Sequence, residues 1–391
     1  MTTLTTTRSR AEPPPRADEH RPGNFLVISA HDYRSPRKAN IHFIARELAR
    51  RGPTRFFSLR YSALSRFTAD PRLSLDARAN RIERQDGVDC FLWKTALHPF
   101  NTRRALLRPL ETLMFHWYVR SASPVLARWI AEASVILFES GTAPVFFDLA
   151  ARVNPAARTV YIASDDLDTI NAADYVKRTF RRIAPALDAI RLPSRALART
   201  VPGAARLFFI PHGIDPTLAT QGDPSPYGSG THAVSVGSML FDPAFFAFAS
   251  HRFPDIDFHI IGSGQPRHPG YGRNVAVYDE MAHADTVRYI KHAHIGIAPY
   301  RAARLPDYLA DTSMKLIQYD FFGLPAVCPA AVVGDYRSRF GYQPGDAASV
   351  VAAIRAALAA PRLSSRRHLS WVEVVDRVLD PVRFEDTRMA P

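Results

Sequence analysis

The sequence predicts an α/β protein built from two doubly wound, Rossmann-like domains that face each other across a cleft. The chain has 391 residues, which is long enough for two domains of ordinary size. Short apolar runs rich in β-forming residues alternate with helical stretches, as in parallel sheets covered on both faces. This alternation restarts after a polar stretch at residues 216–230 that contains glycine and proline. Because ligands bind beyond the carboxyl ends of the strands in such sheets, we expect the functional site in the interdomain cleft.

The first domain is expected to span residues 24–215. It opens with an apolar run at 24–30, and Ile41, Ile44 and Leu48 then recur with helical spacing before Gly52. Further strands are expected at residues 55–59, 88–93, 135–139, 159–163, 189–192 and 207–210. This half of the chain therefore predicts one largely parallel sheet.

The second domain is expected to span residues 216–365. Its strands are expected at residues 232–236, 257–261, 275–278, 295–298 and 326–328, with a helix at 284–292. Residues 366–391 are expected to form a separate segment whose helix, around 371–379, packs back on the first domain. Residues 1–23 are rich in Thr, Pro and Arg, and we expect them to be a disordered tail.

The charge, the cysteine content and the apolar runs of the sequence limit the classes of binding partner and the cellular location. Lys and Arg number 50 against 37 Asp and Glu, a net charge of +13, which suits a phosphorylated substrate, an acidic membrane surface or nucleic acid. Cys90 and Cys328 are too far apart in sequence to suggest a disulfide framework, so a cytoplasmic location is expected. The sequence has no run of about 18 apolar residues, so any membrane contact is expected to be peripheral.

The most informative motif is TSMKLIQYDFFGLPAVCP at residues 312–329, which predicts a polar turn, a short helix, a break and a buried strand. Backbone N–H groups at the start of this helix, together with Ser313 and Lys315, are suited to hold a phosphate. Gln318 lies one turn further on, where its amide can reach a sugar hydroxyl. The alternative is an ordinary capped helix that packs Leu316 and Ile317 into a core.

Several motifs occur together in an order that resembles glycosyltransferases of the GT-B fold. They are FIPHGID at 209–215, SVGSML at 235–240, IIGSG at 260–264 and the helix motif above. Within that fold the chain is most similar to bacterial β-glucuronosyltransferases of xanthan-type exopolysaccharide synthesis. The segments that carry this resemblance also include YIASDDLDTI at 161–170 and APY at 298–300.

This resemblance implies transfer of glucuronate from UDP-glucuronate to a polyprenyl-diphosphate-linked oligosaccharide at the cytoplasmic face of the bacterial inner membrane. It implies Asp165 as the catalytic base. It also implies that UDP is bound by Met239, Tyr300, Ser313, Met314, Lys315 and Gln318. Gln318 stands where many GT-B members place a ribose-binding Glu, a departure that agrees with the narrower family.

Inverting transfer needs one general base, and Asp165 at the end of an apolar strand is suited to that role. Asp166 and Asp168 offer neighbouring positions, and carboxylates this close raise one another's pKa. The alternative is that this cluster only caps a helix.

The departing UDP needs positive charge, which Lys315 and the helix N-terminus can supply without a metal or other cofactor. The spacing of His283, His292 and His294 matches no usual zinc site. Specific binding of the glucuronate carboxylate of the donor requires a cation. The candidates are Arg301, Arg304 and Lys315. Asp215 in the PHGID motif is a further candidate, either as a cap or as a substrate contact.

Basic and aromatic residues between 102 and 132 predict an acceptor or membrane surface, with Arg103, Arg104 and Trp117 as its candidates. Arg34, Arg37 and Lys38 precede a helix and are candidates to meet the acceptor's diphosphate. The alternative is that the aromatic side chains pack in the core and the arginines only face water.

Three other functions are alternatives: a GT-B transferase with another sugar nucleotide, a UDP-sugar epimerase and a basic nucleic-acid-binding protein. An epimerase needs no lipid acceptor, so product formed from the UDP-sugar alone would identify it. The sequence shows no helix-turn-helix, ribonucleoprotein or zinc-finger signature, so no nucleic-acid partner is expected.

Overall fold

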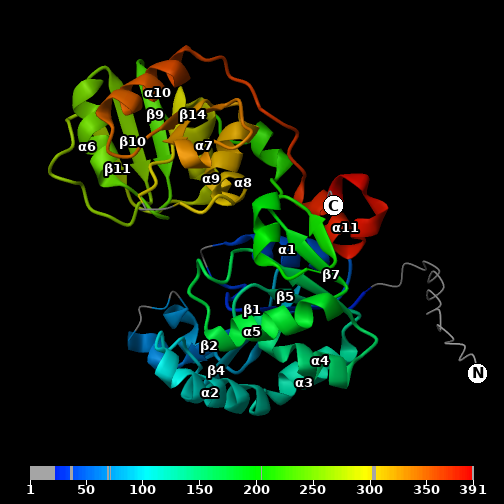
Figure 1. Ribbon diagram of the computed structural model, residues 1–391. Helices are drawn as coiled ribbons and strands as arrows, with labels where there is room; N and C mark the ends of the chain where they lie inside the picture. Colours follow the sequence, from blue (N-terminus) through cyan, green and yellow to red (C-terminus); the bar gives the residue numbers. More distant parts are fainter. Residues whose placement is uncertain are drawn as a thin grey trace, which may run out of the picture.

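The computed structural model describes residues 23–35, 38–67, 70, 72–203, 205–301 and 305–389. The expected tail, apart from residue 23, lies outside these residues. The described chain forms two separate sheets, each with helices on both sides, and Figure 1 shows them as two lobes. The predicted fold class is therefore confirmed, whereas the exact domain limits at residues 215 and 365 stay predictions.

The first sheet has eight strands in the described part of the chain, in the order β3-β4-β2-β1-β5-β6-β7-β8. Neighbouring strands are parallel except β3 and β4, which are antiparallel. The strands are β1 (Phe25–Ser29), β2 (Thr54–Ser62), β3 (Ile82–Gln85), β4 (Val88–Thr95), β5 (Val135–Glu139), β6 (Arg158–Ile162), β7 (Ala189–Leu192) and β8 (Leu207–Phe209).

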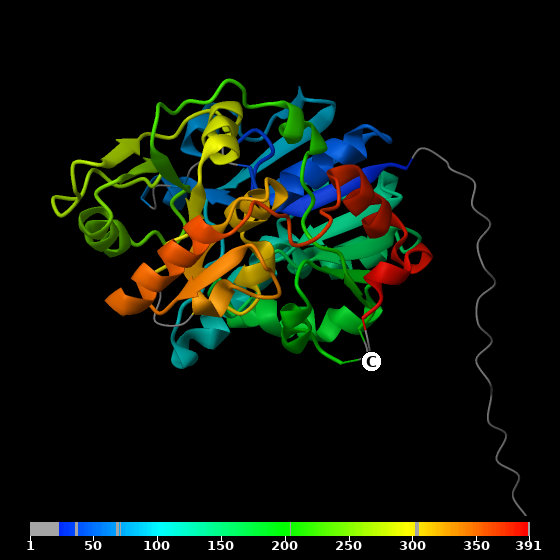
Figure 2. The ribbon, with the colours of Figure 1, turned by 90° about the horizontal axis from the view of Figure 1, so that it is seen from above.

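Helices cover both faces of this sheet. One face packs against α2 (Arg108–Arg120), α3 (Pro124–Glu132), α4 (Phe147–Val153) and α5 (Asp174–Ile183). The other packs against α1 (Asn40–Ala49) and against α11 (Trp371–Leu379) from the far end of the chain. Trp371 stacks on Phe43 of α1 with ring centroids 4.9 Å apart, and Figures 1 and 2 both show α11 beside α1. The C-terminal segment therefore packs against elements of the first sheet.

The second sheet has six strands in the described residues, in the order β11-β10-β9-β12-β13-β14, and all its pairs are parallel. The strands are β9 (Thr231–Val236), β10 (Ile256–Ile261), β11 (Val275–Tyr278), β12 (Ile295–Ile297), β13 (Ala326–Pro329) and β14 (Arg339–Tyr342). The helices are α6 (Pro243–Arg252), α7 (His283–His292), α8 (Leu309–Thr312), α9 (Met314–Phe321) and α10 (Ala347–Ala359). Apolar side chains of α6 and α10 cover one face, and those of α7 and α9 cover the other.

Every strand expected from the sequence is present, and the predicted and observed ends agree to within three residues. The sequence prediction missed two strands, β3 and β14. β3 is an edge strand with the polar sequence IERQ and none of its residues buried, so it carries no apolar pattern. β14 has the sequence RFGY, in which Arg339 and a glycine interrupt the apolar run.

Candidate active site

The carboxyl ends of three adjacent parallel strands bring polar side chains together in the first domain. β1, β5 and β6 lie side by side in the sheet, and His31, Glu139 and Asp165 stand at or just beyond their ends. Nε2 of His31 lies 3.9 Å from Oε1 of Glu139. The backbone N–H of Asp165 donates to Oγ of Ser140, 3.2 Å away, next to Glu139. The fold thus places Asp165 where ligands of such sheets bind.

Asp165 has the electrostatic properties of a base that works near neutral pH. Burial, together with the nearby charge of Glu139, raises the pKa of its carboxyl from an ordinary value of 3.8 to about 6. A base with this pKa is ionised at pH 7 and still binds a proton strongly enough to accept one from a hydroxyl.

Glu139 and His31 were not among the residues selected from the sequence. Glu139 is buried and accepts hydrogen bonds from Oγ of Ser29 and from Oγ of Ser164, the latter at 3.0 Å. Its negative charge is one reason for the raised pKa of Asp165. The signal in the sequence was available, because Glu139 ends an apolar strand in the same way that Asp165 follows one.

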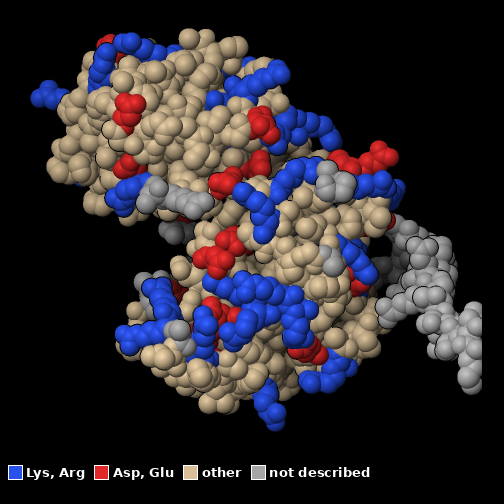
Figure 3. All heavy atoms as spheres, in the orientation of Figure 1, with Lys and Arg blue, Asp and Glu red and all other residues tan. Residues whose placement is uncertain are grey.

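A residue of the second lobe contacts the proposed base. The hydroxyl of Tyr308, at the N-terminal end of α8, lies 3.5 Å from Oδ1 of Asp165. Asp166 and Tyr308 also line a pocket of about 460 Å³ whose walls come from both halves of the chain. Figure 3 shows the hollow between the two lobes. The expected interdomain cleft therefore has Asp165 at its edge, next to a segment that leads directly into α9.

The donor-side residues also gather beyond strand ends, here those of β9 and β12. Met239 lies in the turn after β9 and is 48% exposed, and Tyr300 follows β12. Phe241 and Tyr300 form an antiparallel bridge, and the N–H of Arg301 donates to the carbonyl of Leu240. These backbone bonds hold the two loops against each other.

The predicted helix begins where the sequence placed it. Ser313 is the N-cap of α9, and its Oγ accepts from the N–H of Leu316 at 3.4 Å. The hydroxyl of Tyr300 is hydrogen-bonded to the same Oγ at 2.5 Å, and the Tyr300 side chain is fully buried. Both side chains therefore fix the start of α9, whose first N–H groups have no partner within the helix.

Lys315 has no counter-charge in the described structure. Its Nζ is buried, has no hydrogen-bond partner among the described residues and lies 5.2 Å from the centre of the Tyr300 ring. Burial lowers the pKa of this ammonium from 10.5 to about 7. A buried cation without a partner is costly, which is the physical reason for the lowered pKa.

The remaining donor-side candidates occupy different environments. Met314 is half-buried and packs against apolar clusters of both lobes. The amide of Gln318 lies 2.8 Å from Nε2 of His283. Arg301 is exposed, and Arg304 lies outside the described residues. Asp215 accepts hydrogen bonds from the N–H and Oγ1 of Thr217, so it caps a 3₁₀ turn.

The cations of the loop before α1 differ in their surroundings. Arg34 is buried, and its guanidinium donates to both carboxylate oxygens of Asp32 and to Glu83 at 2.6 to 2.9 Å. Lys38 donates to the carbonyl of Tyr33 at 2.6 Å. Arg34 is therefore engaged within the loop, whereas Lys38 is exposed, and acceptor binding by Lys38 stays a prediction. Arg37 lies outside the described residues.

The segment around α2 presents both charge and apolar surface. Arg103 and Arg104 are exposed, and Trp117 is 50% exposed. Other large apolar side chains of this segment are also exposed: Phe100, Leu106, Leu107, Leu110 and Leu113. By contrast, Phe115 and Tyr118 of α2 are buried in the core, so only part of the aromatic stripe predicted from the sequence faces outward. No helix of the described chain is long and apolar enough to cross a membrane.

No group of three or more metal-ligating side chains is found among the described residues. Of the three histidines considered as zinc ligands, His283 contacts Gln318, His292 contacts Asp223 at 2.9 Å, and Nδ1 of His294 accepts from the N–H of His232. These contacts give each histidine a local structural role.

Comparison with known proteins identifies the family. A family model for the N-terminal domain of glucuronosyltransferase GumK matches residues 27–193. Over 367 residues the chain is 60% identical to the UDP-glucuronate:glycolipid 2-beta-glucuronosyltransferase of Xanthomonas campestris pv. campestris, covering 94% of this chain and 92% of that protein. The chain belongs to the GumK family of glucuronosyltransferases. As a GumK-family member it is a glycosyltransferase, and the resemblance to exopolysaccharide β-glucuronosyltransferases is confirmed.

Solved structures confirm the GT-B fold of this GumK-family protein. A UDP-forming α,α-trehalose-phosphate synthase from Burkholderia xenovorans matches with a TM-score of 0.61 at 11% identity, over 93% of this chain and 100% of that one. Anabaena HepE, solved with UDP and glucose, matches with a TM-score of 0.58 at 12% identity, over 92% and 99%. At such low identity the likeness concerns the fold.

Proposed function

We propose that this protein transfers glucuronate from UDP-glucuronate to a hydroxyl of a polyprenyl-diphosphate-linked oligosaccharide, with inversion at the anomeric carbon. The substrates follow from its relative, a UDP-glucuronate:glycolipid glucuronosyltransferase that is 60% identical. The observation that carries the proposal in the structure is the buried, unpaired Nζ of Lys315 at the start of α9.

Lys315 and the first N–H groups of α9 bind the diphosphate of UDP in this proposal. Fixed positive charge at this position stabilises the negative charge that develops on the leaving phosphate as the bond to the anomeric carbon breaks. These groups take the part that a metal plays in other transferases, so we propose a reaction without metal or other cofactor. Met239, Met314 and Gln318 surround the nucleotide, and the guanidinium of Arg301 binds the glucuronate carboxylate.

Asp165 is the general base. It accepts the proton of the acceptor hydroxyl while the hydroxyl oxygen forms the new bond to the anomeric carbon and UDP departs from the opposite face. The pKa of about 6 supports this role, because the carboxylate is ionised at neutral pH. The hydroxyl of Tyr308 donates to Asp165 and so links the base to the lobe that contains α9.

The acceptor's lipid requires a membrane location, which we propose to be peripheral and at the cytoplasmic face of the bacterial inner membrane. Exposed apolar side chains of the α2 segment, with Leu106 at 93% and Leu113 at 65% exposure, are suited to enter the headgroup region. Arg103 and Arg104 beside them are suited to anionic lipid. Figure 3 shows basic side chains gathered on the lobe that contains α2.

Incubation of radiolabelled UDP-glucuronate with a lipid-linked oligosaccharide extract tests the proposal. Wild type should transfer label to the lipid fraction, and Asp165→Ala should lose nearly all transfer. Asp168→Ala is the matched control, because Asp168 is exposed and paired with Lys177, so this variant should keep most activity. Label released by wild type only as free sugar or as another UDP-sugar would contradict transfer, and full activity of Asp165→Ala would reject the base.

A further inference from the structure

A second pocket lies in the first domain, on the far side of the loop that carries Asp165. Its volume is about 290 Å³. The lining comes from β2, from α2 and the segment before it, from the loops after β5 and β6, and from α5: Arg60, Pro99, Phe100, Asn101, Arg103, Phe115, Gly141, Thr142, Ile170, Asn171, Ala172, Ala173 and Val176. Because Gly141 directly follows Ser140, whose Oγ binds the backbone of Asp165, this pocket and the proposed base share one wall.

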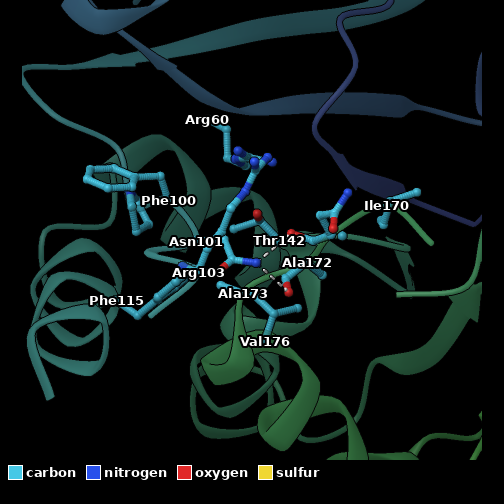
Figure 4. Close-up of a pocket in the computed structure, with 13 residues that line it drawn as sticks. Arg60, Phe100, Asn101, Arg103, Phe115, Thr142, Ile170, Ala172, Ala173 and Val176 are labelled. Atoms are coloured by element: carbon cyan, nitrogen blue, oxygen red, sulfur yellow. Dashed lines mark hydrogen bonds between the residues drawn. The ribbon is translucent and has the colours of Figure 1, made fainter. Parts of the chain in front are cut away.

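The backbone around this pocket is unusually constrained. Arg60, Arg103 and Asn171 all have positive φ angles, of 57°, 56° and 50°. Arg60 also lies in an irregularity of the β2–β4 pairing between Ser58 and Tyr61. Residues other than glycine rarely adopt positive φ, and such positions cluster at functional sites. The irregularity redirects a strand side chain, and Figure 4 shows Arg60 entering the pocket opposite Ala173 and Val176.

Arg60 brings a positive charge to this pocket. Its Nε is buried and has no hydrogen-bond partner among the described residues. The nearby acid Asp70 is already bound by Arg72, which donates to it from Nε at 2.9 Å and from Nη2 at 2.7 Å. Burial and the charge of Arg72 lower the pKa of Arg60, and burial with both arginines lowers the pKa of His98 to about 4. The region is therefore electropositive, because Arg60 and Arg72 both lie near the carboxylate of Asp70, which Arg72 already binds.

The floor of the pocket is polar and held in place. The side-chain amide of Asn101 donates to the carbonyls of Asn171 and Ala172 at 3.0 and 3.3 Å, as the dashed lines in Figure 4 show. These bonds tie the segment before α2 to the loop that follows Asp165. Arg103, two residues after Asn101, is exposed and adds a second guanidinium at the rim.

Apolar, cationic and polar groups meet at this pocket. Phe100, 43% exposed, lines it, and the exposed Leu106 and Leu113 follow in the same segment of the chain. Arg60 and Arg103 bring two guanidinium groups, and residues 170–173 belong to the loop that follows Asp165. A molecule with an apolar tail, an anionic linker and a polar glycan carries the complementary groups. Paired guanidinium groups bind phosphate oxygens especially well.

We infer that this pocket binds the phosphate linker between the lipid and the glycan of the acceptor, with Arg60 and Arg103 as its cationic ligands. This inference rests on the proposed transfer to a lipid-linked acceptor. The linker would hold the acceptor in the first domain so that the glycan extends past Gly141 toward Asp165.

Two synthetic acceptors test the inference: the glycan joined to a short alkyl chain through a diphosphate, and the same glycan as an alkyl glycoside without phosphate. Kinetics are measured in neutral detergent. Wild type should favour the diphosphate acceptor in kcat/KM. Arg60→Met and Arg103→Met should each lower kcat/KM for that acceptor by roughly 10- to 100-fold and change it less than threefold for the glycoside, as expected for loss of a charge-assisted hydrogen bond.

Arg81→Met is the control, because Arg81 is exposed on the first domain and does not line the pocket. UDP affinity should be unchanged in all three variants. Arg60→Met should not lower the melting temperature, because it removes an unpaired buried cation. If it does unfold, Arg103→Met decides the question, since that residue is exposed.

Three results would overturn the inference. Equal losses on both acceptors would show a structural effect, and unchanged kinetics of Arg103→Met would exclude a phosphate contact. If Arg60→Met and Arg103→Met lose binding to phosphatidylglycerol vesicles but keep the wild-type preference for the diphosphate acceptor, the site binds a lipid headgroup instead. Absence of transfer by wild type to either acceptor would instead refute the proposed function, so the two failures are distinguishable.

Discussion

Lys315→Met should make the unliganded protein more stable and at the same time weaken UDP binding. In wild type, burial holds the pKa of Lys315 at about 7 instead of 10.5. Each pKa unit corresponds to about 1.4 kcal/mol, so burying the charged form costs on the order of 5 kcal/mol without an anion. Methionine has a similar length and carries no charge, so the variant avoids this cost.

The sign of the pH dependence follows from the same shift. Between about pH 7 and pH 10.5 the unfolded chain keeps a proton on this lysine that the folded chain has lost, so wild-type stability rises with pH in this range. The stability gained by Lys315→Met should therefore be largest at pH 7 and below and should shrink toward pH 10. Thermal unfolding of both proteins across this range measures the difference, which should amount to several degrees at pH 7.

UDP binding should respond in the opposite direction. Removal of a buried cation from a diphosphate costs roughly 2–5 kcal/mol, so isothermal titration calorimetry should show UDP affinity reduced by about 30-fold or more. For wild type, the UDP dissociation constant should be flat below pH 7 and rise about tenfold per unit above it, because binding then requires proton uptake. Lys291→Met is the matched control. The ammonium of Lys291 is paired with Asp223, so this variant should bind UDP as wild type does. Wild-type UDP affinity in Lys315→Met, or a less stable apo variant at pH 7, would refute this reasoning.

The remaining predictions concern the base and the membrane surface. Asp165→Asn should lower kcat by roughly 10²- to 10⁴-fold while UDP affinity stays within twofold, and retained turnover would reject the base. Wild-type kcat should fall as pH drops through about 6, which gives the acid limb of the pH profile. Glu139→Gln should move this acid limb to lower pH, because the charge of Glu139 raises the pKa of Asp165. An unmoved limb would show that another group titrates. Tyr308→Phe removes a hydrogen bond that lowers this pKa, so it should move the limb to higher pH, and a shift to lower pH would contradict the contact. Trp117→Asp should reduce co-sedimentation with anionic vesicles severalfold, whereas Leu363→Asp, an exposed leucine of the other lobe, should not; equal effects would argue against the α2 surface.

Local pattern was sufficient for most of the fold and for the donor motif. The sequence predicts a helix N-terminus at Ser313 and a strand at residues 326–328, and the structure has α9 starting after Ser313 and β13 at Ala326–Pro329, because short-range signals determine both. The edge strand β3 was missed because it buries no apolar face. It exists through pairing with β4, which its own polar sequence does not encode.

The environment of the candidate site depended on contacts that sequence spacing does not report. The sequence position of Arg34 suits acceptor binding, but in the fold its guanidinium is hydrogen-bonded to Asp32 and Glu83. Conversely, the strand pattern around Arg60 does not indicate a site, although an irregular strand register directs its side chain into a pocket where its Nε has no hydrogen-bond partner among the described residues. Whether a cation is satisfied depends on residues far away in the chain, so it becomes visible only in three dimensions.

A crystal structure of Asp165→Asn with intact UDP-glucuronate would test the central claim most directly. The account predicts Nζ of Lys315 within hydrogen-bonding distance of the diphosphate, and the side chain at position 165 facing the anomeric carbon on the side opposite UDP. A donor bound with its diphosphate away from the start of α9, or with position 165 turned out of the cleft, would contradict it.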